Sequence, residues 1–235
     1  MTDIFALFKQ IEKKDSAPAT PPTHMVVGLG NPGKEYALTR HNAGFRAVDF
    51  LTAEPQTDVT HEKFHALFGI GNIGKYRILF LKPLTFMNSS GEAVREAADF
   101  YKIPPENILV LVDDIYLDAG RMRVRANGSD GGHNGLKSII YQLGADTFPR
   151  IRLGVGKKPT PEYDLADWVL SKMDEGNEKR LEACFPLLAQ AIELVFDGKA
   201  DLAMGLCNGF RADAPQAQEK EKPAETPAQN GENAQ

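Results

Sequence analysis

Short apolar runs alternate along this chain with segments in which apolar residues recur at helical spacing. A short apolar or alternating run bounded by turn residues is typical of a strand, and recurrence every three to four residues is typical of an amphipathic helix. Strands are predicted at 25–29, 64–72, 76–81, 108–112, 121–125 and 151–155. Helices are predicted at 43–51, from Ser89 onward, at 136–143 and through 181–196.

The alternation of strands and helices predicts one α/β domain over 23–210. The run at 108–112 is apolar throughout, as in a strand buried on both faces, whereas 121–125 alternates arginine with apolar residues, as in a half-exposed strand. We therefore predict a single three-layer domain whose central sheet is mixed, largely parallel and twisted, with helices on both faces. Ligands in such folds bind at the carboxyl ends of the strands.

Two segments flank this domain. Apolar residues at helical spacing near the start, followed by the Pro- and Ala-rich stretch DSAPATPP, predict an N-terminal extension over 1–22, made of a short amphipathic helix and a linker. Residues 211–235 have almost no large apolar side chains and are rich in Pro, Gln, Glu and Ala. Such a segment buries too little surface to offset the entropy of ordering, so a disordered tail is predicted.

The composition is that of an ordinary globular protein, with 42% hydrophobic and 25% charged residues. No stretch approaches the roughly 20 apolar residues of a membrane span, and the first residues lack the pattern of a secretory signal. Only Cys184 and Cys207 are present, both in apolar, helix-like surroundings. They argue against a disulfide framework, so we expect structural thiols in a cytoplasmic protein that does not associate with membranes.

The net charge of −5 conceals a basic stretch between Arg121 and Lys158. It carries eight basic residues and two acids, a local net charge of +6: Arg121, Arg123, Arg125, Lys137, Arg150, Arg152, Lys157 and Lys158, with Asp130 and Asp146. Phosphate binding requires local rather than overall positive charge. Alternating arginines also line the solvated face of an edge strand, and the residues alone leave both interpretations open.

One motif suggests a dinucleotide site. The sequence GLGNPG at 28–33 fits G-x-G-x-x-G after a strand. In that motif the third glycine lies in the first turn of the helix, but Lys34, Glu35 and Tyr36 follow here before any helical pattern. Asp49 has the spacing of a ribose-binding carboxylate but falls inside the predicted helix at 43–51. A nucleotide cofactor is therefore not expected.

A second motif suggests zinc. The sequence HEKFH at 61–65 matches H-E-x-x-H, whose two histidines bind zinc only when they share one face of a helix. Alternating apolar residues from Phe64 and three nearby glycines favour a strand instead. In a strand His61 and His65 are too far apart for one ion, so solvent-facing histidines are expected. A zinc hydrolase would lose activity in a chelator, and we predict no such loss.

Polar clusters follow several predicted strands. They are GNPG (30–33), TRHNAG (39–44), KPLTFMNSSG (82–91) and GGHNGLK (131–137). Asp113 and Asp114 end the predicted buried strand. Taken singly, Asn and Gly are turn residues and an Asp after a strand is a common cap. Taken together, side chains at successive strand ends converge on one crevice.

This combination of residues suits hydrolysis by an activated water. An imidazole accepts a proton from water near neutral pH. A carboxylate bonded to its other ring nitrogen fixes the tautomer and stabilises the imidazolium. Amide side chains stabilise a developing oxyanion and hold a peptide backbone. An ester with a good leaving group needs no metal, and no G-x-S-x-G motif supports a serine nucleophile.

At these residues the chain resembles the bacterial-type peptidyl-tRNA hydrolases, which recycle tRNA from prematurely released peptidyl-tRNA. The resemblance covers essentially all of 25–200. It rests on VVGLGNPGKEYALTRHNAGF, KPLTFMNSSG, LVDDIYLD, GSDGGHNGLKS, FPRIRLGVG and DLADWVLSKM, in this order and at family-like spacing. Several motifs in order are far more specific than any one of them.

The resemblance implies a role for individual residues. The family's catalytic histidine falls on His41, its aspartate partner on Asp113, and the asparagine that distinguishes blocked from free aminoacyl groups on Asn31. Positions that line the pocket for the peptide and the terminal nucleoside fall on Tyr36, Phe86, Met87 and Asn88.

Further residues would contact the tRNA. His133 and Asn134 fall on the GGHNG positions, where the family's asparagine binds the tRNA end and orients water or the oxyanion. Arg125 and Arg152 match basic positions that hold the 5′ phosphate, which favours the phosphate interpretation of the basic stretch. The resemblance implies peptidyl-tRNA as substrate, no cofactor or metal, and a monomer without an obligate protein partner.

The loop DDIYLDAG departs from the family pattern. Family members often carry a histidine before the catalytic aspartate and a proline-rich turn after it, but Val112 precedes Asp113 here and Asp118-Ala119 occupies the turn. Some organellar relatives have become RNA-binding splicing factors. The presence of His41, Asp113 and Asn31, together with Asn88, favours an active enzyme over that alternative.

Overall fold

The computed structural model describes residues 20–53 and 57–212. Within this part of the chain seven strands form one sheet, in the order β2-β3-β4-β1-β5-β7-β6. In chain order the strands are β1 (His24–Gly28), β2 (His61–Lys63), β3 (Ala66–Ile73), β4 (Tyr76–Pro83), β5 (Ile108–Asp114), β6 (Met122–Arg125) and β7 (Arg150–Gly154).

The sheet is mixed. Its four central strands β4, β1, β5 and β7 run parallel to one another, and β6, β3 and β2 add antiparallel pairs at the two edges. The predicted three-layer α/β fold is confirmed, with the parallel pairing confined to the centre of the sheet. The carboxyl ends of all four central strands therefore lie at the same end of the sheet.

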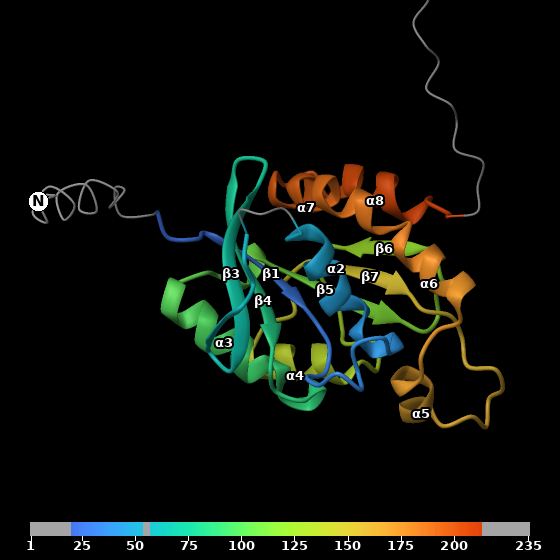
Figure 1. The fold of residues 1–235 in the computed structure, drawn as a ribbon. Helices are drawn as coiled ribbons and strands as arrows, with labels where there is room; N and C mark the ends of the chain where they lie inside the picture. The colour runs from blue at the N-terminus through green and yellow to red at the C-terminus, as the bar shows by residue number, and fades with distance from the viewer. Residues whose placement is uncertain (1–19, 54–56, 213–235) are drawn as a thin grey trace, which may run out of the picture.

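Helices cover both faces of the sheet (Figure 1). They are α2 (Ala43–Leu51), α3 (Ser90–Tyr101), α4 (Asn134–Leu143), α5 (Leu165–Leu170), α6 (Glu175–Glu182), α7 (Leu188–Phe196) and α8 (Ala200–Asn208). Four 3-10 turns join them: η1 (Arg40–Asn42), η2 (Met87–Ser89), η3 (Pro105–Asn107) and η4 (Phe185–Leu187). One face packs on α2, α6, α7 and α8, and the other on α3 and α4.

The strand β5 shows why its sequence is apolar without interruption. Leu109 and Leu111 pack into the core on the α2 face, while Ile108 and Val110 pack into the core on the α3 face. Because successive side chains of a strand point to opposite faces, a strand covered on both sides has no solvent-facing position. The last residues of β5, including Asp113, are buried as well.

Two predicted elements differ from the structure. Phe64 does not begin a strand, because Phe64 and His65 form a left-handed turn between β2 and β3. The helix predicted through 181–196 is interrupted by η4, where Pro186 has no N–H to continue the helical hydrogen bonds.

Helix α2 lies unusually close to the sheet because of two glycines. A Cβ on Gly44 would lie 2.3 Å from the carbonyl oxygen of Leu111, and one on Gly28 would lie 2.4 Å from the carbonyl oxygen of Gly44. Real Cβ atoms do not approach so closely, so only glycine fits at this crossing of α2 with β1 and β5. The close approach sets the turn η1 against the end of β5.

The predicted N-terminal helix and linker, apart from residues 20–22, and the predicted tail, apart from residues 211 and 212, lie outside the described residues. Within the described residues no helix is both long and apolar enough to cross a membrane.

Candidate active site

A cavity of about 520 Å³ opens where the central parallel strands end. Residues at the ends of three neighbouring strands line it: Asn31 follows β1, Met87 and Asn88 follow β4, and Asp113 lies near the end of β5. His41 reaches the same cavity from η1. The sequence clusters thus converge as predicted, since parallel strands end at one edge of the sheet.

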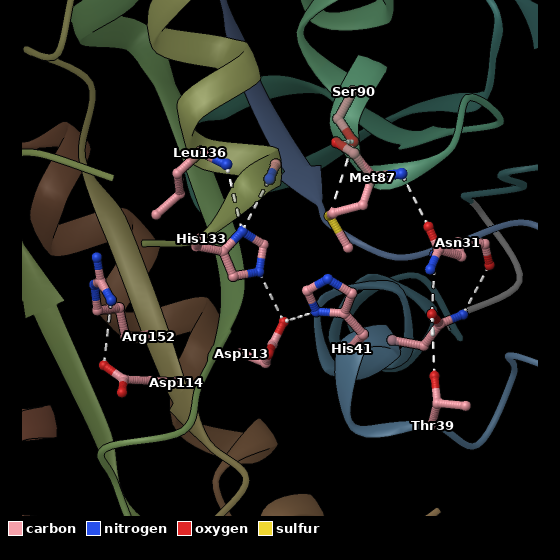
Figure 2. Close-up of polar contacts among 12 residues, drawn as sticks. Asn31, Thr39, His41, Met87, Ser90, Asp113, Asp114, His133, Leu136 and Arg152 are labelled. Carbon is pink, nitrogen blue, oxygen red and sulfur yellow. Dashed lines mark hydrogen bonds and ion pairs between the residues drawn. The ribbon is translucent and has the colours of Figure 1, made fainter. Parts of the chain in front are cut away.

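His41, Asp113 and His133 form a buried cluster in this cavity (Figure 2). The Nδ1 atom of His41 lies 3.0 Å from Oδ1 of Asp113, and Nε2 of His133 lies 2.9 Å from the same oxygen. The two imidazole rings are 4.9 Å apart, centroid to centroid. Asp113 is only 3% exposed, so these two histidines take the place of water around its carboxylate.

The backbone of α4 fixes the tautomer of His133. Its Nδ1 atom accepts hydrogen bonds from the backbone N–H groups of Gly135, at 3.1 Å, and Leu136, at 3.4 Å. That nitrogen therefore carries no proton, and Nε2–H donates to Asp113. His41 likewise donates Nδ1–H to Asp113, which leaves its Nε2 atom without a proton and able to accept one when the ring is neutral.

The same contacts shift the pKa values of the pair. Burial alone lowers the pKa of His41, but the charge of Asp113 and its hydrogen bond together outweigh burial and raise it. Burial alone raises the pKa of Asp113, but the two histidines lower it well below its usual range. Asp113 is therefore ionised whenever His41 acts as a base.

Asn31 is held rigidly beside this cluster. Its backbone N–H donates to Oδ1 of Asn42 at 2.9 Å, and Nδ2 of Asn42 donates to the Asn31 carbonyl at 3.0 Å. The side-chain Oδ1 of Asn31 accepts from the backbone N–H of Met87 at 2.9 Å (Figure 2). With its oxygen engaged, the free end of the Asn31 side chain is the Nδ2 donor.

The other residues predicted for the pocket also line the cavity: Tyr36, Phe86, Met87, Asn88, His133 and Asn134. Tyr36 and Phe86 meet edge to face with ring centroids 6.5 Å apart. The far wall of the cavity is apolar and is formed by residues 165, 166, 169 and 170 of α5. These residues were not among the predicted site residues. They lie within the motif DLADWVLSKM that carries the resemblance, but an apolar side chain does not by itself indicate the wall of a pocket.

A second cavity, of about 400 Å³, adjoins the first, and Arg125 and Arg152 both line it. Arg123 lies opposite Arg152, and Arg125 opposite Arg150, in the antiparallel pair β6 and β7. Like charges placed directly opposite in a sheet destabilise it, so this concentration of arginine favours an anion site over a solvated strand face.

The basic stretch does not act as one surface. Arg150 is 1% exposed and donates to the backbone carbonyls of Gly128, Ser129, Asp146 and Phe148. Burial, with a smaller effect of Arg152, lowers the pKa of Arg150 to about 10. Arg150 therefore supports the 128–129 loop, while Arg125 is exposed to ligands.

The structure explains why neither the dinucleotide motif at 28–33 nor the zinc motif at 61–65 forms a site. Gly28 lets α2 pack close to the sheet. Asp49 is an exposed residue of that helix and forms an ion pair with Lys82. His61 lies in the edge strand β2, and His65 in the following turn contacts Glu96. Neither motif forms the ligand geometry of its class.

Among the described residues, His41, Asp113 and His133 form a group with ligand atoms close enough for a metal ion. Both facing nitrogens, however, lie at hydrogen-bond distance from one carboxylate oxygen, and Nδ1 of His133 is engaged with the backbone. A metal would need these atoms directed at a shared empty point about 2 Å away. The geometry fits hydrogen bonds and does not fit a metal centre.

Arg40 links the site to α5, and it was not among the predicted site residues. Its buried guanidinium donates to the Val155 carbonyl at 3.3 Å, to Oγ of Ser171 at 2.6 Å and to the Lys172 carbonyl at 2.7 Å. It also lies 3.5 Å from the centre of the Trp168 ring. These partners are more than a hundred residues away in sequence, so no local pattern indicates them.

A histidine–carboxylate pair among carboxamides, at the carboxyl ends of parallel strands and beside an arginine-lined cavity, defines an α/β enzyme of the hydrolase class. The family model for peptidyl-tRNA hydrolase matches residues 25–217. The chain belongs to the peptidyl-tRNA hydrolase family.

Individual relatives agree with this assignment. The peptidyl-tRNA hydrolase of Clostridium novyi (strain NT) is 46% identical over 188 residues, which cover 80% of this chain and 99% of that protein. The one from Caldicellulosiruptor bescii is 44% identical over 186 residues, or 79% and 97% of the two chains. The crystal structure of Acinetobacter baumannii peptidyl-tRNA hydrolase superposes with a TM-score of 0.75 at 34% identity, covering 83% of this chain and all of that one.

Proposed function

We propose that this chain hydrolyses the ester between peptide and tRNA in peptidyl-tRNA with a water molecule that His41 activates. Membership of the peptidyl-tRNA hydrolase family supports the substrate and the reaction. The observation that carries the mechanism is the buried hydrogen bond from His41 to Asp113 in a cavity lined by carboxamides.

His41 acts as the general base. With Nδ1–H donated to Asp113, Nε2 takes a proton from water while the water oxygen bonds to the ester carbonyl carbon. The bond between that carbon and the ribose oxygen then breaks, and the proton on His41 passes to the leaving ribose oxygen. Asp113 stays ionised and stabilises the imidazolium between the two steps.

Asn31 recognises the acylated amino group of the substrate. Because its Oδ1 is engaged with Met87, its Nδ2 donates to the carbonyl of an acylated amine. A free amine is protonated near neutral pH and is itself a donor, so it would face Nδ2 without a partner and bring an unpaired charge into the site. The enzyme thereby spares ordinary aminoacyl-tRNA.

Asn88 and Asn134 position the substrate and donate to the oxyanion that develops on the carbonyl oxygen. Both are exposed side chains that line the cavity, and a single donor of this kind contributes on the order of 10²–10³ in rate. The apolar wall from α5 receives the peptide side chains.

Arg125 and Arg152 bind the 5′ phosphate of the tRNA in the second cavity. Every group invoked comes from one chain, which supports a monomer without an obligate protein partner. The substrate arises during translation, which supports the cytoplasm as the place of action and tRNA recycling as the role.

A release assay tests the reaction. N-acetyl-aminoacyl-tRNA should lose its acyl group rapidly, the unblocked aminoacyl-tRNA should remain intact, and a chelator should leave the rate unchanged. Binding of both RNAs without any release would instead indicate an RNA-binding protein, as in the organellar relatives, and would contradict the proposal.

The His41→Ala variant tests the base. Its turnover should fall by about 10²–10⁴, since a positioned general base contributes about that factor, while its affinity for deacylated tRNA stays unchanged. Near-normal turnover in this variant would assign the base to another residue.

A further inference from the structure

Tyr116 lies on the boundary between the two cavities. It follows β5 directly, its side chain is 70% exposed, and it lines both the cavity that holds His41 and the arginine-lined cavity. The reaction described above gives this aromatic ring no role. Exposure alone is common among surface aromatic residues, but a position at the junction of two cavities makes this ring a candidate contact for a ligand that spans both.

The turn that carries Tyr116 is firmly held. The backbone N–H of Tyr116 donates to Oδ1 of the buried Asp114 at 2.7 Å. The next residue, Leu117, is buried, and its carbonyl accepts from the N–H of Gly156 at 2.9 Å. The ring is therefore presented from a fixed backbone and loses little freedom when a ligand covers it.

Asp114 couples the turn to the arginine-lined cavity. Its second oxygen, Oδ2, lies 3.4 Å from Nη1 of Arg152 (Figure 2), while Oδ1 holds the backbone of Tyr116. One buried carboxylate thus holds both the backbone of Tyr116 and the guanidinium of Arg152, and both residues line the two cavities. An aromatic face and a cation at the junction of two cavities suit a nucleotide, which carries both a base and a phosphate.

We propose that Tyr116 is a stacking platform for a nucleobase of the single-stranded 3′ end of the tRNA, with Asp114 as its positioning residue. The inference rests on the proposed function, since the ester must occupy the first cavity and a phosphate the second. The 3′ end then runs past the ring that separates them. Stacking on an aromatic face needs no specific hydrogen bonds to the base, so this contact contributes affinity without reading sequence.

Binding of deacylated tRNA tests the platform independently of catalysis. Tyr116→Ala should raise the Kd about tenfold, whereas Tyr116→Phe, which keeps the ring, should bind like the unaltered protein. Tyr141→Ala is the matched control, because Tyr141 is 82% exposed on α4 and lines neither cavity. Equal Kd values for the unaltered protein and Tyr116→Ala would overturn the proposal.

Modified tRNAs locate the contact. Two modified tRNAs are compared, one without the base of the terminal nucleotide and one without the base of the penultimate nucleotide. With one of these tRNAs, the Kd values of Tyr116→Ala and the unaltered protein should be equal. A difference that persists with both modified tRNAs would also overturn the proposal. If the unaltered protein binds tRNA but releases no peptide, the proposed reaction fails while the Kd comparison still decides the role of Tyr116.

Discussion

His41 and His133 contact the same oxygen of Asp113, yet their surroundings give them different chemistry. Both ring nitrogens of His133 are engaged, one by Asp113 and one by the first N–H groups of α4. His41 uses only one ring nitrogen on the carboxylate. Of these two neighbouring imidazoles, His41 is therefore the one with a nitrogen left for water.

The pH profile tests the coupling of His41 to Asp113. The base must be unprotonated, so kcat/KM should rise with pH through the pKa of His41, which Asp113 raises above its ordinary value of about 6.5. In Asp113→Asn the raising charge is gone and burial remains, so the acid limb should move to lower pH.

The plateau of the same profile should fall in Asp113→Asn by about 10²–10⁴, because the amide no longer stabilises the imidazolium. An acid limb that stays in place or moves to higher pH would contradict the pairing. The Asn42→Ala variant provides a comparison within the site, since the side chain of Asn42 forms hydrogen bonds with Asn31 and not with the Asp113 carboxylate.

Residue chemistry was predictable from sequence only where a motif carried it. His41, Asp113 and Asn31 lie in motifs whose order along the chain the family shares. Arg40 makes its contacts with residues 155–172, and nothing in the residues beside it indicates that distant segment. Arg150 belongs to the basic stretch whose role the residues alone left open, and burial with four backbone carbonyls gives it a structural role.

At the scale of elements, the crossing of α2 over the sheet determines where the turn η1, which carries His41, lies. Gly44→Ala should destabilise the protein by about 1–3 kcal/mol, because its Cβ would meet the Leu111 carbonyl in a packed core. It should also lower activity, since η1 directly precedes α2. Thermal unfolding and peptide release measure the two effects.

Gly205→Ala is the control for this substitution. Gly205 lies inside α8, and an added Cβ there meets no atom within 4 Å. Alanine is favoured over glycine within a helix by about 0.5–1 kcal/mol, so this variant should be slightly more stable. Equal destabilisation by both substitutions would show that the close approach at Gly44 has no special importance.

Element boundaries were predictable where periodicity was strong, as in the helix at 43–51. They failed where one residue decides the backbone. Phe64 continues an alternating apolar pattern yet sits in a left-handed turn, since the hairpin needs a reversal there. Pro186 lies inside a run of helical periodicity and ends it.

At the scale of the whole molecule, the net charge of −5 conceals a local concentration of arginine, at which we propose that tRNA phosphate binds. Arg125→Gln should weaken tRNA binding and reduce the slope of log K against log salt by about 1, since each neutralised phosphate contributes about 0.7–0.9. Titration of the Kd against salt measures the slope.

Lys75→Gln is the matched control for that charge change. Lys75 is exposed directly before β4, at the end of the sheet opposite the carboxyl ends that form the site. The same loss of one positive charge there should leave the slope unaltered. Equal slopes for Arg125→Gln and the unaltered protein would exclude a phosphate contact at Arg125.

Arg40 finally joins two parts of the site that would otherwise be independent. It is bonded covalently to His41, and its guanidinium forms hydrogen bonds with residues that directly follow the apolar wall from α5, with Trp168 of α5 stacked on it. We therefore expect an outward displacement of that wall to shift the backbone that carries the imidazole. The width of the pocket and the position of the proposed base would then change together.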